Sequence, residues 1–203
     1  MSEPTKRALL IGIDEYDVER WRLYGCENDS HAIHSVLIDP FGFPPDNITQ
    51  VLSGEATRER ILREFERLIE ATRPGDIVVT HYAGHGSYMK DLEGDEADGY
   101  DETIVTHDSH HKGEKPNLDI NDDEIHNLLL RLAEKTDYVT MIFDCCHSGT
   151  MTRDISGDEA RAVEGDERTG PEMGREPLDP ASRPPAARRA VRAAGCRSAT
   201  STY

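Results

Sequence analysis

The chain has 203 residues and a formal net charge of -17 at pH 7, with 31% charged and 36% hydrophobic residues. This length suits one α/β domain with its own core. The acidic balance argues against nucleic acid and anionic membrane surfaces as partners, because both would repel the protein. No segment approaches the roughly twenty apolar residues that a spanning helix needs.

Cysteine usage indicates the compartment. The four cysteines, two of them adjacent, do not form a plausible disulfide framework for a chain of this size. No apolar signal segment precedes the first predicted strand. We therefore expect a cytoplasmic protein.

The first half of the chain alternates between strand and helix patterns. Apolar runs of four to eight residues are typical of buried parallel strands, and apolar residues at helical spacing separate them. The expected elements are a strand at 6–13, a helix at about 30–38 capped by Asn28 or Asp29, a strand at 48–52, a helix from Thr57 and a strand beginning at Ile77. Such a series predicts a mostly parallel sheet with right-handed crossovers.

The second half is less regular. Between Lys90 and Asn121 we expect a long acidic loop with a small hairpin near 103–106. A helix should then run from Asp122 to about Lys135 and lead into a buried strand at 138–143. Residues 155–203 hold five of the eleven prolines and few large apolar side chains, so we expect a disordered linker or tail after a domain at 1–154.

Two predicted strands end in reactive side chains. The apolar run 138–143 stops at Asp144, Cys145, Cys146 and His147, and the strand that begins at Ile77 leads to a glycine turn that carries His85. Ligands of open α/β sheets bind outside the carboxyl ends of the strands. If the two strands are neighbours, His85 meets a thiol from a distant part of the chain, which forms a cysteine–histidine dyad.

The motifs HYAGHG (81–86) and DCCHSG (144–149) resemble those of the caspase-like cysteine peptidases, above all the metacaspases and their prokaryotic relatives. Further matches are LYGCENDSHAI (23–33), GDEADGYDETI (94–104) and INDDEI (120–125), in the order of that family. The resemblance implies a three-layer α/β/α sandwich. It also implies that 1–154 corresponds to the large-subunit region, with the small-subunit strands missing from 155–203.

The resemblance implies a role for each residue of the dyad. Cys146, directly before His-Ser-Gly, corresponds to the nucleophile, and Cys145 is a packed neighbour. His85 would activate the thiol and then protonate the leaving amine. The backbone N–H groups of Gly86 and Cys146 could form the oxyanion hole.

The resemblance also implies a specificity pocket. Asp29 and Asp144 correspond to acids at its floor, with Cys26 lining it and Ala83 at a wall position where relatives often carry serine. Two carboxylates would select arginine or lysine by charge pairing. The alternative is that Asp29 only caps its helix and Asp144 only ends a strand.

A calcium site is a further implication. Asp101, Asp122, Asp123 and Asp154 match the carboxylates that bind an activating calcium ion in calcium-dependent metacaspases, although Asp154 lies about one position off the pattern. Acids from separate loops suit a hard cation, but Asp122 and Asp123 are equally explained by their place at a helix N-terminus. No organic cofactor is expected.

The remaining histidines suggest simpler roles. His147 should point away from the thiol and make a structural hydrogen bond, and His81 should be a core or supporting residue. His107, His110 and His111 have no complete partner set for a transition metal, so we expect a solvated loop there.

The leading interpretation is a cysteine endopeptidase that cuts proteins or peptides after Arg or Lys through an acyl-enzyme. The alternative is a non-catalytic interaction or assembly module, or a fragment that needs a partner or small-subunit chain to complete its sheet. A hydrolase of another type is disfavoured, because the sequence has no G-x-S-x-G elbow and no complete metal-ligand set.

Overall fold

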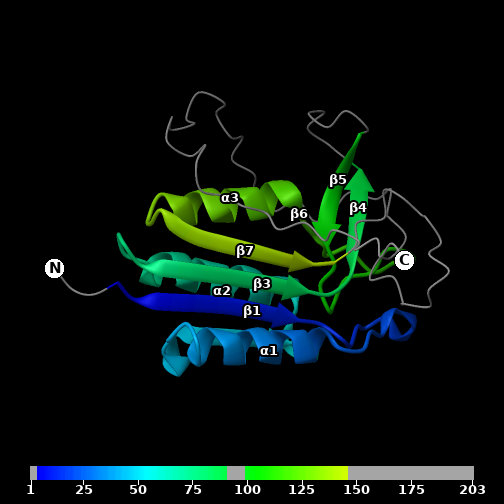
Figure 1. Ribbon diagram of the computed structural model, residues 1–203. Helices are drawn as coiled ribbons and strands as arrows, with labels where there is room; N and C mark the ends of the chain where they lie inside the picture. The colour runs from blue at the N-terminus through cyan, green and yellow to red at the C-terminus, as the bar shows by residue number, and fades with distance from the viewer. Residues whose placement is uncertain (1–3, 91–98, 146–203) are drawn as a thin grey trace, which may run out of the picture.

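A parallel sheet between helices forms the body of the protein in the computed structural model, which describes residues 4–90 and 99–145 (Figure 1). The strands of this sheet lie in the order β2-β1-β3-β7, all parallel. Its strands and helices are β1 (Lys6–Gly12), α1 (Cys26–Ile38), β2 (Ile48–Leu52), α2 (Arg58–Ala71), β3 (Ile77–Ala83), α3 (Asp122–Ala133) and β7 (Tyr138–Asp144).

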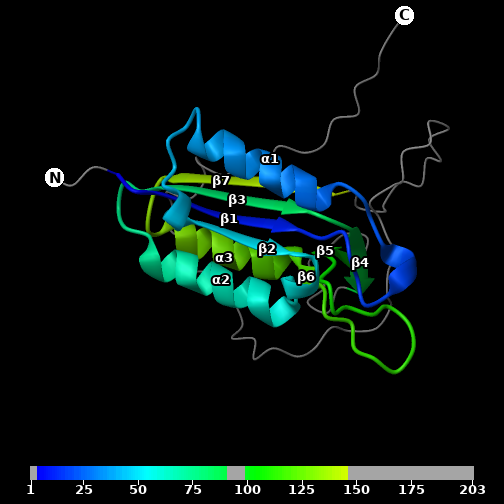
Figure 2. The ribbon, with the colours of Figure 1, turned by 90° about the horizontal axis from the view of Figure 1, so that it is seen from below.

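Helices cover both faces of the sheet, with α1 on one face and α2 and α3 on the other (Figure 2). Alternate residues of each strand point to opposite faces. In β1, Leu10 packs in the smaller core under α1, whereas Leu9 and Ile11 join the larger core under α2 and α3. The predicted α/β/α sandwich with a mostly parallel sheet is confirmed.

Helix α1 begins four residues earlier than the predicted helix, at Cys26. Its N-cap is Gly25, whose φ of 113° favours glycine, and no cap side chain bonds the first turn. Instead Asp14, which follows β1, accepts hydrogen bonds from the backbone N–H groups of Cys26 (2.8 Å) and Glu27 (3.3 Å). The expectation that Asn28 or Asp29 caps this helix is therefore wrong, because a carboxylate distant in sequence satisfies its first amides.

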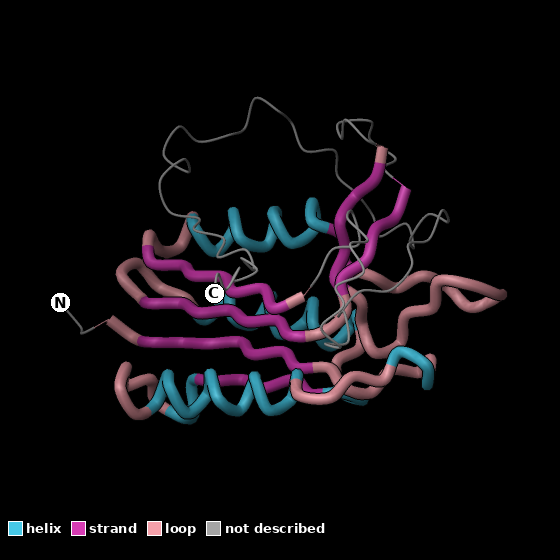
Figure 3. Tube along the Cα trace, turned by 45° about the vertical axis from the view of Figure 1, so that its right-hand side comes forward, coloured by secondary structure: helices cyan, strands magenta, loops and turns pink. Residues whose placement is uncertain are grey.

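The segment between β3 and α3 is more ordered than the predicted long loop. The described residues there form a small antiparallel sheet of β4 (Gly86–Lys90), β5 (Tyr100–Ile104) and β6 (Ile120–Asn121). Figure 3 shows this sheet standing beyond the carboxyl ends of the parallel strands. It begins at Gly86, directly after His85, and so borders the end of the main sheet where the candidate site lies.

Strand β7 lies at the edge of the main sheet as far as residues 4–90 and 99–145 show. Its pairing partner there is β3, from Ile77 opposite Tyr138 to Ala83 opposite Asp144. Within these ranges no strand other than β3 pairs with β7, and the expectation that small-subunit strands are missing concerns residues outside them. Residues 155–203, which the sequence assigns to a tail, lie outside them.

Candidate active site

The candidate site lies where β3 and β7 end side by side. The register pairs Ala83 with Asp144, and the Gly84 N–H donates to the Asp144 carbonyl oxygen at 3.4 Å. The turn that carries His85 is therefore next to Cys145, which is buried at 7% exposure. The predicted adjacency of the two strands is confirmed. Cys146, the expected nucleophile, lies outside the described residues.

The imidazole of His85 is buried and fixed by a main-chain acceptor. Its Nε2 lies 2.8 Å from the carbonyl oxygen of Trp21, and the residue is 4% exposed. A carbonyl can only accept a hydrogen bond, so Nε2 carries the proton and Nδ1 is the basic nitrogen of the neutral ring. In this tautomer the neutral ring can accept a proton at Nδ1. No motif of the sequence predicts this contact with Trp21.

Two tyrosine hydroxyls hold the backbone of His85. The His85 N–H donates to the Tyr16 hydroxyl at 2.9 Å, and the Tyr82 hydroxyl lies 2.7 Å from the His85 carbonyl oxygen and 2.9 Å from that of Val105. Burial raises the pKa of both tyrosines well above the ordinary value, so both stay protonated. A Cβ on Gly84 would lie 2.6 Å from the Tyr82 hydroxyl oxygen, which explains the glycine in this turn.

The strand pairing at Gly86 determines the direction of its N–H. Gly86 lies opposite Ile104, and the neighbouring pair is hydrogen-bonded through Val105 N and His85 O at 3.0 Å. Bonded and non-bonded pairs alternate along an antiparallel ladder. Gly86 therefore belongs to a non-bonded pair, and its N–H points away from β5.

A hollow of about 320 Å³ brings Asp29 and Asp144 together. Its lining comes from α1, β3 and β7, namely Asp29, Ala32, Ile33, His81, Ile142, Phe143 and Asp144. Cys26 and Ala83 are fully buried and do not belong to this lining. His81, expected to be a core or supporting residue, is buried at 3% exposure and lines this hollow.

The acids expected at a calcium site are only partly described. Asp101 is buried on β5 and accepts a hydrogen bond from Nδ2 of Asn121, the N-cap of α3, at 2.9 Å. Asp122 and Asp123 occupy the first turn of α3, whereas Asp154 lies outside the described residues. Within 4–90 and 99–145, no group of three or more His, Cys, Asp or Glu side chains is arranged to hold a metal ion.

The three histidines after β5 have two different environments. His107 and His110 each place Nε2 3.5 Å from a carboxylate oxygen of Asp17. His111 is buried at 4% exposure, with Nε2 2.8 Å from an Asp119 carboxylate oxygen. The expectation of a solvated loop is therefore wrong for His111, because Asp119 supplies a buried partner that sequence spacing did not reveal.

No helix in the described parts of the chain has the length and apolar character to cross a membrane.

The fold and the site define an α/β protein with a histidine and a cysteine-bearing strand end at the carboxyl edge of a parallel sheet. The family model of the metacaspase, peptidase C14 domain matches residues 6–154. The chain therefore belongs to the metacaspase family of cysteine-type endopeptidases.

Individual relatives agree with this assignment. Metacaspase-1 of Botryotinia fuckeliana is 39% identical over 151 residues, which cover 71% of this chain and 35% of the relative. Metacaspase-1 of Saccharomyces cerevisiae is 34% identical over 152 residues, with 72% and 34% covered. A crystal structure of a Geobacter sulfurreducens protein matches with a TM-score of 0.58 and 28% identity, over 72% of this chain and 52% of that one. The chain thus spans about a third of the length of these curated relatives.

Proposed function

We propose that this chain is a cysteine endopeptidase domain that uses Cys146 and His85 to cleave proteins after arginine or lysine. The observation that carries the proposal is the buried His85 ring, with Nε2 2.8 Å from the Trp21 carbonyl oxygen, beside the end of β7. A ring held in this tautomer next to the strand end that carries Cys145 is suited to proton transfer at Nδ1.

The reaction would proceed in two acyl-transfer steps. The Cys146 thiol gives its proton to Nδ1 of His85, and the thiolate attacks the carbonyl carbon of the substrate. The Gly86 N–H donates to the oxyanion of the tetrahedral intermediate. The protonated His85 then gives its proton to the leaving amine, which departs as the thioester forms. Water, deprotonated by His85, hydrolyses the thioester and regenerates the thiol.

Substitution of each cysteine tests the nucleophile. Cys146→Ala should abolish cleavage of an arginyl peptide and labelling by an arginyl chloromethyl ketone, whereas Cys145→Ala should keep most of both. His85→Ala should reduce kcat by several orders of magnitude, roughly 10³-fold or more. Activity that survives in Cys146→Ala would reject the assignment.

Basic specificity is supported by Asp29 and Asp144 lining one hollow. The alternative that Asp29 only caps α1 is not supported, because Asp14 accepts the hydrogen bonds of the first amides of this helix. A paired arginine there would gain charge-assisted hydrogen bonds of about 1.5–3 kcal/mol, or roughly ten- to a hundred-fold selectivity over a neutral residue. Peptides that differ only before the cut, tested with wild type and Asp29→Ala, measure this. An unchanged arginine preference in the folded variant would refute the pocket.

Calcium activation is a separate part of the proposal. It is supported by the buried Asp101, which Asn121 ties to the acidic first turn of α3. Asp101, Asp122, Asp123 and Asp154 would hold the ion, whose charge would draw their separate segments together. Calcium added to chelator-treated protein should raise both the cleavage rate and the thermal midpoint, because it binds the folded state. An Asp123→Asn variant that responds as wild type does would remove this residue from the site.

The competing function is a non-catalytic assembly module, and the edge position of β7 is the observation that favours it. A partner or small-subunit chain could add strands there. Co-expression with such a chain, followed by the chloromethyl ketone assay, distinguishes the two functions: a completed domain that stays unlabelled would favour the module. From cysteine usage alone, we also propose that this protein is located in the cytoplasm.

A further inference from the structure

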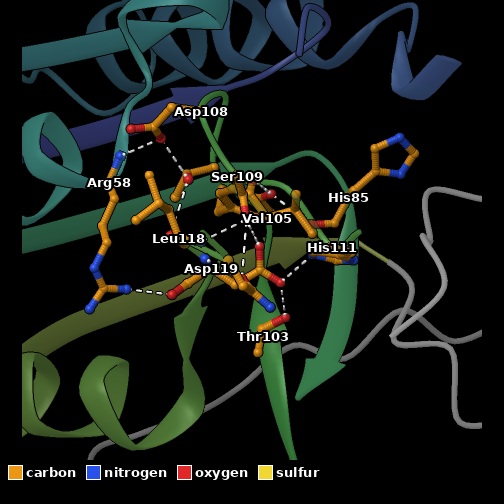
Figure 4. A network of polar contacts seen from close by, with 12 residues as sticks. Arg58, His85, Thr103, Val105, Asp108, Ser109, His111, Leu118 and Asp119 are labelled. Atoms are coloured by element: carbon orange, nitrogen blue, oxygen red, sulfur yellow. Dashed lines mark hydrogen bonds and ion pairs between the residues drawn. The ribbon is translucent and has the colours of Figure 1, made fainter. Parts of the chain in front are cut away.

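A buried contact between a histidine and a carboxylate lies behind the candidate catalytic histidine. His111 Nε2 is 2.8 Å from Asp119 Oδ2, and the two side chains are 1% and 0% exposed. The carboxylate of Asp119 also accepts hydrogen bonds from the hydroxyls of Thr103 (2.9 Å) and Ser109 (2.5 Å), as Figure 4 shows. Because hydrogen bonds reach both carboxylate oxygens, Asp119 and the His111 ring have little freedom to move.

The His111 ring contacts the indole of Trp21. The ring centroids are 4.7 Å apart with an interplanar angle of 60°, and aromatic pairs favour such an edge-on arrangement. Tyr16 contacts the same indole, with centroids 6.3 Å apart at 81°. Trp21 is 8% exposed and ends the three-residue 3-10 helix η1 (Glu19–Trp21) between β1 and α1.

The position of Trp21 sets the position of its carbonyl oxygen. Backbone hydrogen bonds from Trp21 N to Val18 O (2.8 Å) and from Leu23 N to Asp14 O (2.8 Å) hold η1, and the packing of the indole adds to them in setting the place of Trp21. The carbonyl oxygen of the same residue accepts the hydrogen bond from His85 Nε2 at 2.8 Å. Contacts therefore run without a break from Asp119 through His111 and Trp21 to His85.

We propose that His111 is a positioning residue for His85, which it controls through the indole of Trp21. Only the predicted effects on kcat and KM rest on the proposed peptidase function. With His111 in place, the Trp21 carbonyl holds the His85 ring in the Nε2–H tautomer, with Nδ1 as the base. Without the ring contact, the carbonyl moves and His85 loses both its fixed orientation and its single tautomer.

A matched set of variants separates positioning from simple stability. His111→Gln keeps an N–H donor for Asp119 but removes the aromatic ring from Trp21, whereas His111→Phe keeps the ring and loses the donor. His110→Gln is the neighbouring control, because His110 faces Asp17 instead. We expect kcat to fall about 10- to 100-fold in His111→Gln, the cost of a misplaced catalytic group, with KM within about twofold. His111→Phe should lose stability and keep kcat within about threefold of wild type, and His110→Gln should keep both near wild type.

Two measurements test the inference without any activity. Trp21 is the only tryptophan of the chain, so its emission spectrum should change in His111→Gln and not in His110→Gln. Long-range ¹H–¹⁵N spectra of the nine histidines, with the His85 signals assigned from a His85→Gln variant, report the tautomer directly. His85 should be Nε2–H in wild type and mixed in His111→Gln.

The outcomes are distinguishable. A folded His111→Gln variant with unchanged His85 tautomer overturns the inference, and so does a kcat that falls equally in the Gln and Phe variants. If His111→Gln does not fold, Trp21→Leu removes the same contact from the other side, and an unchanged tautomer there also overturns it. A wild-type chain that has the expected tautomer but cleaves no peptide rejects the proposed peptidase function and leaves the positioning role intact.

Discussion

Two tyrosine hydroxyls help to determine where His85 lies. Tyr16 accepts a hydrogen bond from its N–H, and Tyr82 donates toward its carbonyl oxygen. The Tyr16 hydroxyl takes the place of a ladder acceptor for the His85 N–H, whereas the His85 carbonyl oxygen keeps its ladder bond from Val105 N at 3.0 Å. Since burial raises the pKa of both phenols, neither becomes a buried anion near the site.

Removal of the Tyr82 hydroxyl should therefore affect both folding and rate. Tyr82→Phe leaves the Val105 carbonyl oxygen without the bond that it receives at 2.9 Å. We expect the free energy of unfolding to fall by about 1–3 kcal/mol and kcat to fall about tenfold. Urea unfolding and peptide cleavage measure the two effects. The matched control is Tyr24→Phe, at a tyrosine that is 76% exposed, and equal effects in both variants would contradict the prediction.

Single residues also mark the limit of what the sequence could predict. His85 was found because it follows an apolar run, but Trp21 and Asp119 act through contacts that no local pattern encodes. Arg58 is a charged residue at the start of α2. It is 6% exposed, bonds the Asp119 carbonyl oxygen and pairs with Glu124 of α3. Helical periodicity identifies a polar position, but it cannot show that the side chain bonds an acceptor from a distant part of the chain.

At the level of elements, one carboxylate joins the amino ends of two strands. Asp76, just before β3, accepts hydrogen bonds from the backbone N–H groups of Thr5 (2.9 Å) and Arg73 (3.0 Å) and pairs with Arg7 of β1 at 3.3 Å. Burial alone would raise the pKa of Asp76, but the bonds from Arg73, Thr5 and Arg7 outweigh it and lower the pKa below 3.8. The parallel register of β1 and β3 is thereby fixed at the end away from the site.

The lowered pKa predicts how stability responds to acid. A carboxyl with a folded-state pKa below its unfolded value stabilises the fold above the unfolded value, here 3.8, and loses that contribution as pH falls through the folded pKa. Asp76→Asn should lower the free energy of unfolding by about 1.5–3 kcal/mol at pH 7, and the gap to wild type should shrink below about pH 4. Urea unfolding at several pH values, with the exposed Glu114→Gln as control, measures it. A gap that is constant with pH would refute the ionic origin.

The elements themselves were largely predictable, and the errors have physical causes. Apolar runs located β1, β2, β3 and β7, and helical spacing located α2 and α3. The start of α1 was missed because Asp14 caps it from outside the helix. Strand β4 was missed because Gly86–Lys90 has no alternating apolar pattern and gains its order by pairing with β5.

At the scale of the whole molecule, the charge of -17 at pH 7 makes self-repulsion a general cost of the folded state. Salt reduces this repulsion, since the screening length falls from about 30 Å at 0.01 M to about 8 Å at 0.15 M. The acidic composition therefore produces a salt response that is independent of any specific metal site.

We expect sodium chloride, raised from about 10 to 150 mM, to increase the thermal midpoint by a few degrees. Calcium at matched ionic strength should add a further increase only if it binds a specific site, and magnesium serves as the control ion. Scanning calorimetry of chelator-treated protein measures both. A midpoint that does not change with salt would contradict the role of self-repulsion.

The pairing of β3 with β7 also determines when the site can form. Thr80 and Met141 are neighbours in the sheet although they lie 61 positions apart in the chain. Such non-local pairing is slow, because the intervening chain loses entropy before the contacts form. During synthesis β3 emerges long before β7, so His85 is made before the strand that lies beside it in the folded domain. On the ribosome, the candidate site therefore stays incomplete until β7 has emerged and paired with β3.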